Sequence, residues 1–228
     1  MAKKQEQVAD GIEAVESALS RSEQFIEDNQ HILTTVVVIV IAVVGLYLGY
    51  NKFYLLPLED EAQSQMFVAE QHFERDSFNL ALNGDLNYPG FLGIIDDYSP
   101  TKAANLANYY AGISYLHLGQ FESAIEYLEA FSSNDKMLKP ISLGAIGDAS
   151  MELGNKEEAA SFYIKAAKAS ENEFTTPIYL MKAGQAYELV GDNKNALKVY
   201  KQIKEKYKKS AEGRVIEKYI TRAEINIK

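Results

Sequence analysis

The chain has 228 residues, of which 47% are hydrophobic, and its formal net charge at pH 7 is −9. Cysteine is absent, which excludes disulfide bonds and cysteine-based metal sites. The residues that follow the long apolar run near the N-terminus are numerous enough for one helical domain with a continuous core.

Residues 1–31 predict a cytoplasmic amphipathic helical segment. Ile12, Val15, Leu19 and Ile26 recur at helical spacing and form one apolar stripe that can pack against a partner helix or a coiled-coil strand. Seven acidic residues against three basic ones disfavour contact with an anionic membrane surface. The alternative is a marginal amphipathic helix with no specific partner.

Residues 32–54 predict one transmembrane helix with an aromatic flank. The nineteen residues from Ile32 to Tyr50 carry no charge and, as a helix, cover about 28 Å, which is close to the thickness of the bilayer hydrocarbon. A cleaved signal peptide is disfavoured because thirty mostly polar residues precede the run and no small-residue cleavage site follows it. A buried core helix is the other alternative, and the uninterrupted β-branched character argues against it.

The basic residues near this span predict its orientation. Lys3, Lys4 and Arg21 precede it, whereas Lys52 is the only basic residue between the span and Arg75. Because cytoplasmic flanks carry more Lys and Arg, we expect a single-pass protein with a cytoplasmic N-terminus and an extracytoplasmic domain.

Residues 55–98 predict an irregular first hairpin with an insertion. Pro57 is expected to break the helix beyond the span, and a second short helix is expected near Ser77. Turn signals around Gly84 and Gly90 follow. No Lys-Ser/Thr pair follows these glycines and no strand precedes them, so a phosphate-binding loop is not indicated.

Residues 99–228 predict a regular array of helical hairpins with a C-terminal capping helix. Gly119, Gly154 and Gly191 stand 35 and 37 residues apart, where each ends a first helix in a left-handed cap. Small residues at equivalent places predict close helix approach, with larger side chains filling the space beside them. These are Gly112, Gly147 and Gly184 in the first helices, Ala124, Ala159 and Ala196 in the second, and Leu128, Tyr163 and Tyr200 beside them. Ser99 and Thr176 are expected to cap helices that begin at the prolines after them.

These residues resemble the tetratricopeptide repeat (TPR). The large-small-aromatic order of that family appears as Ala111-Gly112 with Tyr115 and as Ala183-Gly184 with Tyr187, while Ser150 replaces the aromatic residue after Ile146-Gly147. The resemblance implies an all-α fold. It comprises the N-terminal amphipathic helix, a single transmembrane helix and a TPR superhelix with three clear repeats, one irregular N-terminal hairpin and a C-terminal helix.

The whole layout resembles the YfgM-type ancillary subunit of the bacterial Sec translocon, in its Bacteroidota-type version. The segments that carry this resemblance are Pro89-Gly90-Phe91-Leu92-Gly93-Ile94-Ile95-Asp96-Asp97-Tyr98 and Asn105-Leu106-Ala107-Asn108-Tyr109-Tyr110-Ala111-Gly112. It implies a bacterial inner-membrane protein with a periplasmic TPR domain. The implied partners are a SecYEG-type translocon, a periplasmic peptidyl-prolyl isomerase chaperone, or unfolded clients.

The first helices of such repeats line a concave surface, which predicts a partner-binding groove. Its residues are Leu106, Tyr109, Tyr110, Ile113, Leu116, Asp148, Met151, Met181, Gln185 and Glu188. Tyr and Met make adaptable apolar contacts, and no set of basic residues for a C-terminal carboxylate is evident, so an apolar segment is favoured over a charged peptide tail. The alternative is that several of these residues are core between repeats.

Residues 194–222 hold ten Lys or Arg against three Glu. This basic end could meet anionic lipid headgroups or an acidic partner, and nucleic acid is disfavoured by the expected location and the missing motif. The alternative is a solvated capping helix, because terminal repeats need a polar outer face.

Catalysis finds no support in the residue pattern. His31, His72 and His117 lack metal-ligand spacing, and the acidic pairs are adjacent in sequence rather than facing each other. We therefore expect no enzyme activity, no cofactor, no metal and no small-molecule substrate. The sequence predicts a membrane-anchored TPR interaction protein, with an envelope scaffold or a membrane-tethered regulator of a cytoplasmic signalling protein as alternatives.

Overall fold

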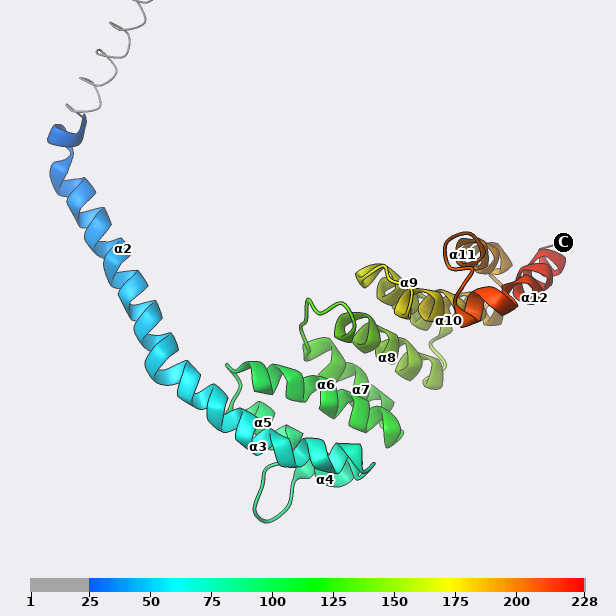
Figure 1. Ribbon diagram of the computed structural model, residues 1–228, viewed down its shortest axis with the longest axis horizontal. Coiled ribbons are helices and arrows are strands. Elements are labelled where there is room, and N and C mark those ends of the chain that lie inside the picture. Colours follow the sequence, from blue (N-terminus) through cyan, green and yellow to red (C-terminus); the bar gives the residue numbers. More distant parts are fainter. Residues whose placement is uncertain (1–24, 228) are drawn as a thin grey trace, which may run out of the picture. The chain divides into compact units, whose positions relative to one another are not determined.

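The computed structural model describes residues 25–227, and every regular element among them is a helix (Figure 1). The chain divides into two compact units, Met1–Leu56 and Pro57–Lys228, which are described separately. The expected all-α class is confirmed, with a long apolar helix followed in sequence by a TPR-type hairpin region.

The first unit contains the apolar helix α2 (Gln30–Tyr50), whose 21 residues include none that is buried. It is therefore not the core helix of a globular unit, and it is long and apolar enough to cross a membrane. The rings of Tyr50 and Tyr54 lie 5.2 Å apart just beyond it. Of the predicted N-terminal stripe, Ile26 is exposed, while Ile12, Val15 and Leu19 lie outside the described residues.

Pro57 does not break the helix, and this expectation was wrong. The π-helical turn η1 (Asn51–Leu55) leads directly into α3 (Leu56–Glu74), and Pro57 is the second residue of α3. In this turn the Leu56 N–H donates to the Asn51 carbonyl, five residues back. A proline lacks the N–H donor and its ring clashes with the carbonyl four residues earlier, so the wider turn lets the helix accept it.

In the second unit, α3 is followed by two short helices, α4 (Phe78–Asn83) and α5 (Phe91–Asp97). The first begins beside Ser77, where a short helix was expected, and the second covers the apolar run from Phe91 to Ile95. The turn between them needs glycine. Gly84 has φ +74°, and a Cβ there would lie 2.2 Å from the Tyr88 carbonyl oxygen. Buried side chains of α3, α4, α5 and α6 form one apolar cluster, with Phe91 and Ile94 fully enclosed.

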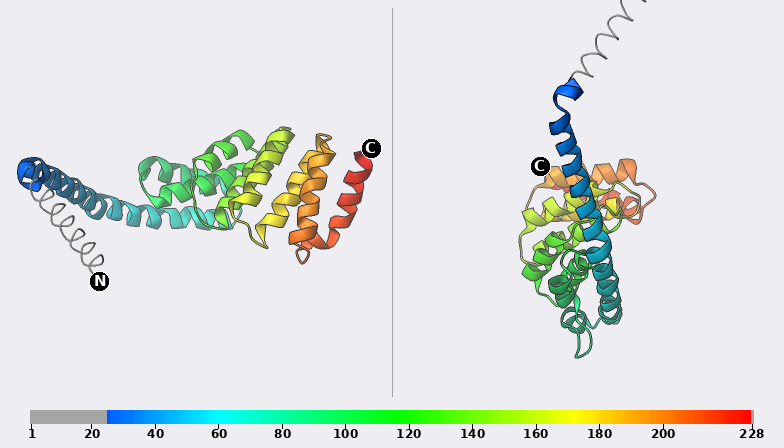
Figure 2. Two further views of the ribbon diagram at one scale, coloured as in Figure 1. Left: turned by 90° about the horizontal axis from the view of Figure 1, so that it is seen from above. Right: turned by 90° about the vertical axis from the view of Figure 1, so that its left-hand side faces the viewer.

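Three hairpins and a closing helix follow. They are α6 (Lys102–His117) with α7 (Phe121–Ala130), α8 (Leu138–Glu152) with α9 (Lys156–Ala169), α10 (Thr175–Leu189) with α11 (Asn193–Lys206), and then α12 (Ala211–Asn226). Figure 2 shows these helices stacked side by side within this unit, from green to red. Burial of one face of each helix against its neighbours supplies the core.

The small residues sit where the helices approach most closely, as predicted. A Cβ on Gly147 would lie 2.6 Å from the Tyr163 ring, and one on Gly184 would lie 2.1 Å from the Tyr200 ring. The alanines of the second helices, Ala124, Ala159 and Ala196, are completely buried. The repeating frame of small and large residues therefore reflects the packing within each hairpin.

Gly119, Gly154 and Gly191 end the first helices in the left-handed conformation, with φ of 73°, 81° and 76°. No atom lies within 4 Å of a Cβ built on any of them, so an alanine there meets backbone strain alone. We predict that Gly154→Ala lowers the free energy of unfolding by roughly 1–2 kcal/mol, measured by urea denaturation. Gly154→Asn is the control, because asparagine tolerates this conformation better; an equal loss for both would contradict the backbone explanation.

The predicted helix caps are displaced by two residues or replaced. Thr101, not Ser99, caps α6: its hydroxyl accepts a hydrogen bond from the Ala104 N–H at 3.0 Å. At α10 the helix begins one residue before Thr176, and the Asn172 side chain accepts hydrogen bonds from the N–H groups of Phe174 and Thr175, both at 2.8 Å. The Ser-Pro and Thr-Pro pairs marked these helix starts, but Thr101 caps α6, and the N-cap residue of α10 is Phe174, whose side chain makes no cap.

Candidate partner-binding groove

A groove crosses the C-terminal halves of α6, α8 and α10. Its hollow has a volume of about 730 Å³, and it brings together Leu116, Asp148, Met151 and Gln185 of the predicted set. His117, Phe121, Glu152, Tyr163, Lys182 and Leu189 line it as well. Glu188 lies in an adjoining hollow of about 420 Å³, together with Gln185, Leu189, Arg222 and Asn226. The surface therefore continues from α6 to α12.

The other predicted groove residues lie elsewhere. Tyr110 stacks on Phe91 with ring centroids 5.1 Å apart, and Tyr109 packs against Phe131. Ile113 joins the cluster around Leu128, and Met181 is buried in the core of the last hairpins. Leu106 lines a separate hollow of about 380 Å³ between α3 and α6, beside Phe67. Their role in binding stays a prediction, and their packing favours core residues over contact residues.

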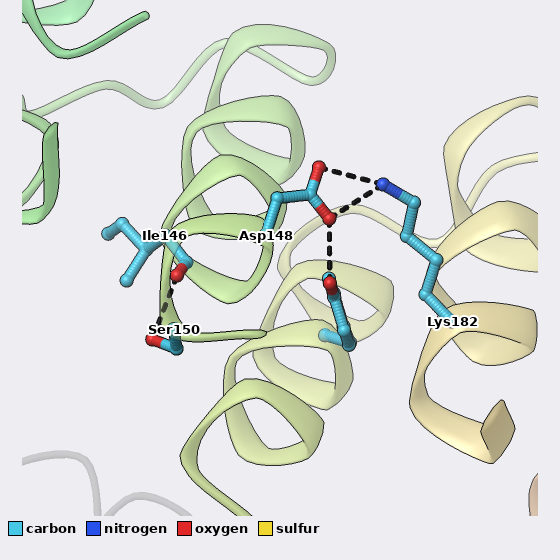
Figure 3. Close-up of polar contacts among 5 residues, drawn as sticks. Ile146, Asp148, Ser150 and Lys182 are labelled. Atoms are coloured by element: carbon cyan, nitrogen blue, oxygen red, sulfur yellow. Dashed lines mark hydrogen bonds and ion pairs between the residues drawn. The ribbon is translucent and has the colours of Figure 1, made fainter. Parts of the chain in front are cut away.

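Asp148 is the centre of a polar cluster in the groove (Figure 3). Lys182 of the next hairpin donates to both carboxylate oxygens at 2.7 Å, and the Tyr163 hydroxyl donates to one of them at 2.6 Å. Burial, and then the nearby Asp148 carboxylate, raises the pKa of Tyr163 well above its ordinary value. We call this arrangement a lock. In a lock, a carboxylate accepts hydrogen bonds from a tyrosine of its own hairpin or the helix after it and from a basic side chain of a helix further along the chain.

A second lock joins α10, α11 and α12. The Tyr200 hydroxyl donates to Glu188 at 3.0 Å, and Arg222 donates to the same carboxylate through Nε at 2.9 Å and through Nη2. The Glu188 side chain is only 12% exposed, so losing either partner would leave a largely buried carboxylate with fewer hydrogen bonds. Burial, followed by the Glu188 carboxylate, raises the pKa of Tyr200.

The sequence analysis did not predict the two locks, although the sequence contains a pattern that indicates them. In both, the base follows its acid by 34 positions, close to one repeat length, and the tyrosines occupy equivalent places in the second helices. The first hairpin has Leu128 at that place and forms no such lock. Asp148 joins α8 to α10 and Glu188 joins α10 to α12, while their contact with a partner stays a prediction.

The groove that remains for a partner has a mixed lining. Lys182 neutralises Asp148, and the His117 ring stacks on Phe78 at 4.5 Å. The exposed Glu152 forms no ion pair among the described residues, and Leu116, Met151 and Leu189 supply apolar surface beside it. Ser150, which replaces the aromatic residue of the repeat, is buried and donates to the Ile146 carbonyl at 2.9 Å (Figure 3). Such a lining suits an apolar segment of a protein.

A further hollow of about 410 Å³ lies between α7 and α8, away from the groove. Leu128, Ile146 and Phe162 line it, and the loop from Phe131 to Asn134 forms its rim. The helix α7 has 10 residues, whereas α9 and α11 each have 14. The shorter helix leaves this junction less completely filled than the next one. Among residues 25–227, no group of three or more His, Asp or Glu side chains could hold a metal ion.

Comparisons with known proteins identify the repeats. Models of the tetratricopeptide repeat match residues 106–135, 141–173 and 179–210, which are the three hairpins. The chain therefore contains tetratricopeptide repeats, a fold that serves as a protein-interaction scaffold.

Two solved structures share this fold. They hold the nearly identical TPR-like repeats of a protein described as a Podosopora anserina kinesin light chain, one of them with a single substitution. Each has a TM-score of 0.56 and 14% sequence identity, and each comparison covers 74% of this chain and 87% or 88% of the other. No curated protein matches the chain in sequence.

Proposed function

We propose that this chain is a membrane-anchored TPR interaction protein that holds an apolar segment of another protein in the groove across α6, α8 and α10. The observation that carries the proposal is the groove itself, a hollow of about 730 Å³ in which Asp148 is already paired with Lys182. Leu116, Met151 and Leu189 offer apolar contacts there, beside the charged Glu152. The anchor is α2, which has no buried residue and is long and apolar enough to span a bilayer.

The setting we propose is the periplasmic face of the bacterial inner membrane, at a SecYEG-type translocon. The resemblance of the layout to YfgM-type subunits supports it, as does the excess of basic residues before the span. The partner is then the translocon, a periplasmic peptidyl-prolyl isomerase chaperone or an emerging unfolded client. Because an anchored domain meets its partners at high local concentration, weak contacts in the groove are sufficient.

A single engineered cysteine tests the groove and the topology together, because the chain has no cysteine of its own. Gln185 is exposed and lines the groove, so we choose the Gln185→Cys variant. Intact spheroplasts that contain this variant are treated with a membrane-impermeant maleimide that carries a photoreactive group. We expect labelling, followed on illumination by crosslinks to a discrete set of translocon, chaperone or secretory proteins identified by mass spectrometry.

Ser161→Cys is the matched control, because Ser161 is exposed on α9 and does not line the groove. It should be labelled equally but capture none of those proteins. No labelling at either position in intact spheroplasts would refute the periplasmic location. Equal labelling with the same crosslinks from both positions, or with none, would refute the groove as the binding surface.

A further inference from the structure

The loop between α9 and α10 presents a phenylalanine to solvent. Phe174 is 74% exposed, although the loop around it is firmly held. The Asn172 side chain accepts from the N–H groups of Phe174 and Thr175 and donates to the Ser170 carbonyl and the Thr175 hydroxyl, all within 2.9 Å. Because hydrogen bonds already fix the conformation of this loop, little conformational entropy is lost when the exposed ring binds another molecule or surface.

Three lysines lie beside this loop, at the end of α11 and in the turn that leads to α12. Lys206, Lys208 and Lys209 line a hollow of about 420 Å³ together with Glu173 and Glu205. All three lysines are exposed, and none forms an ion pair within residues 25–227. By contrast, Lys201 and Lys204 of α11 are paired with glutamates of α12. Three lysines without an ion pair among the described residues therefore lie together at the end of this hairpin that Phe174 occupies, beside Glu173 and Glu205.

We propose that this edge, which we call the Phe174 edge, contacts the surface of an anionic lipid bilayer. An aromatic ring settles at the boundary of headgroups and acyl chains, while lysines beside it reach lipid phosphates. An acidic protein segment would use the lysines but would have no need of a rigidly presented ring. Glu173 and Glu205 offset part of the charge, so the contact is weak by itself and depends on the membrane anchor proposed above.

The chain contains no tryptophan, which gives the inference a direct optical test. The full-length Phe174→Trp variant is placed in lipid nanodiscs of phosphatidylglycerol or of phosphatidylcholine, each prepared with and without brominated acyl chains. We expect a blue-shifted emission that brominated lipid quenches in the anionic discs, with much weaker quenching in the zwitterionic discs.

Leu189→Trp is the matched control. Leu189 is 57% exposed and ends the helix that Phe174 precedes, about 22 Å along the helix axis from it. Its emission should not respond to brominated lipid. Equal quenching at both positions, or equal quenching in both lipids, would overturn the proposal.

The lysines are tested in the Phe174→Trp background by Lys206→Glu, Lys208→Glu and Lys209→Glu together. Each lysine near an anionic surface raises the affinity for that surface about fivefold. The affinity of the Phe174 edge for anionic lipid should therefore fall on the order of a hundredfold, and the quenching should disappear. Unchanged quenching would refute the role of charge. A blue shift produced by soluble polyglutamate, with no response to anionic lipid, would assign the edge to an acidic protein instead.

The two proposals fail in distinguishable ways. A chain that does not co-purify with the nanodiscs refutes the membrane anchor, whereas an incorporated chain with an unquenched Trp refutes the lipid contact alone. Crosslinking from Gln185→Cys does not depend on the lysine substitutions, so it reports the groove in either case.

Discussion

Replacing Gly184 by alanine is expected to lower the free energy of unfolding by about 2–3 kcal/mol. The new Cβ would lie 2.1 Å from Cε1 and 2.5 Å from Cζ of Tyr200. That ring cannot step aside easily, because it is completely buried and its hydroxyl is held in the lock with Glu188. Urea denaturation followed by circular dichroism measures the loss.

Tyr200→Leu provides the test of this explanation. Leucine lacks Cε1 and Cζ, the two ring atoms nearest the new Cβ. It still leaves a contact of its own, because a Cβ on Gly112 would lie 2.5 Å from Cγ of the equivalent Leu128. In the Tyr200→Leu background, Gly184→Ala should therefore cost about 1 kcal/mol less than it does beside Tyr200, because the two closest contacts are gone and alanine is the better helix former. The same loss in both backgrounds would show that the tyrosine ring is not the obstacle.

Alkaline pH is expected to destabilise the domain through three buried tyrosines. Burial is the largest cause that raises the pKa of Tyr163, Tyr179 and Tyr200, and neighbouring carboxylates add to it. Each folded-state pKa thus exceeds the unfolded value of about 10. Their contribution to stability is fully present below pH 10 and is lost as the pH rises towards the folded-state values. The free energy of unfolding should fall by up to about 1.4 kcal/mol per pH unit for each tyrosine.

Urea midpoints measured between pH 9 and pH 11.5 give this slope. Tyr163→Phe, Tyr179→Phe and Tyr200→Phe should each flatten it, because phenylalanine has no proton to lose. Phe162→Leu is the control and should shift the midpoints equally at every pH, since it removes a buried side chain without a titratable group. A slope that survives all three substitutions would assign alkaline unfolding to other groups.

The sequence was sufficient to predict the hairpin array, because the residues that specify it act locally. Gly154 ends a helix through its own φ, and Gly147 and Tyr163 pack within a single hairpin. The π-helical turn before Pro57 and the cap at Thr101 were not predictable in the same way. Each depends on which of several nearby polar groups meets a free backbone N–H or carbonyl, and residue preferences alone do not decide this.

The groove was predicted only in part, for a different physical reason. Helical spacing indicates which residues share a face, but it does not show what covers that face. Tyr110 is enclosed because Phe91 arrives from the irregular first hairpin, and Asp148 is neutralised because the pitch between hairpins brings Lys182 to it. Both facts depend on the distance between successive hairpins, which only the three-dimensional arrangement provides.

The uneven placement of the two locks has a mechanical consequence. One lock joins α8 and α9 to α10, and the other joins α10 and α11 to α12. At the α7–α8 junction, by contrast, the Ser142 hydroxyl donates to the Leu128 carbonyl at 3.4 Å, and a hollow of about 410 Å³ lies beside it. An elastic rod bends where it is least braced. When a bound protein exerts a force on the array, we expect it to bend at the α7–α8 junction, while α8 to α12 rotate together as one rigid body.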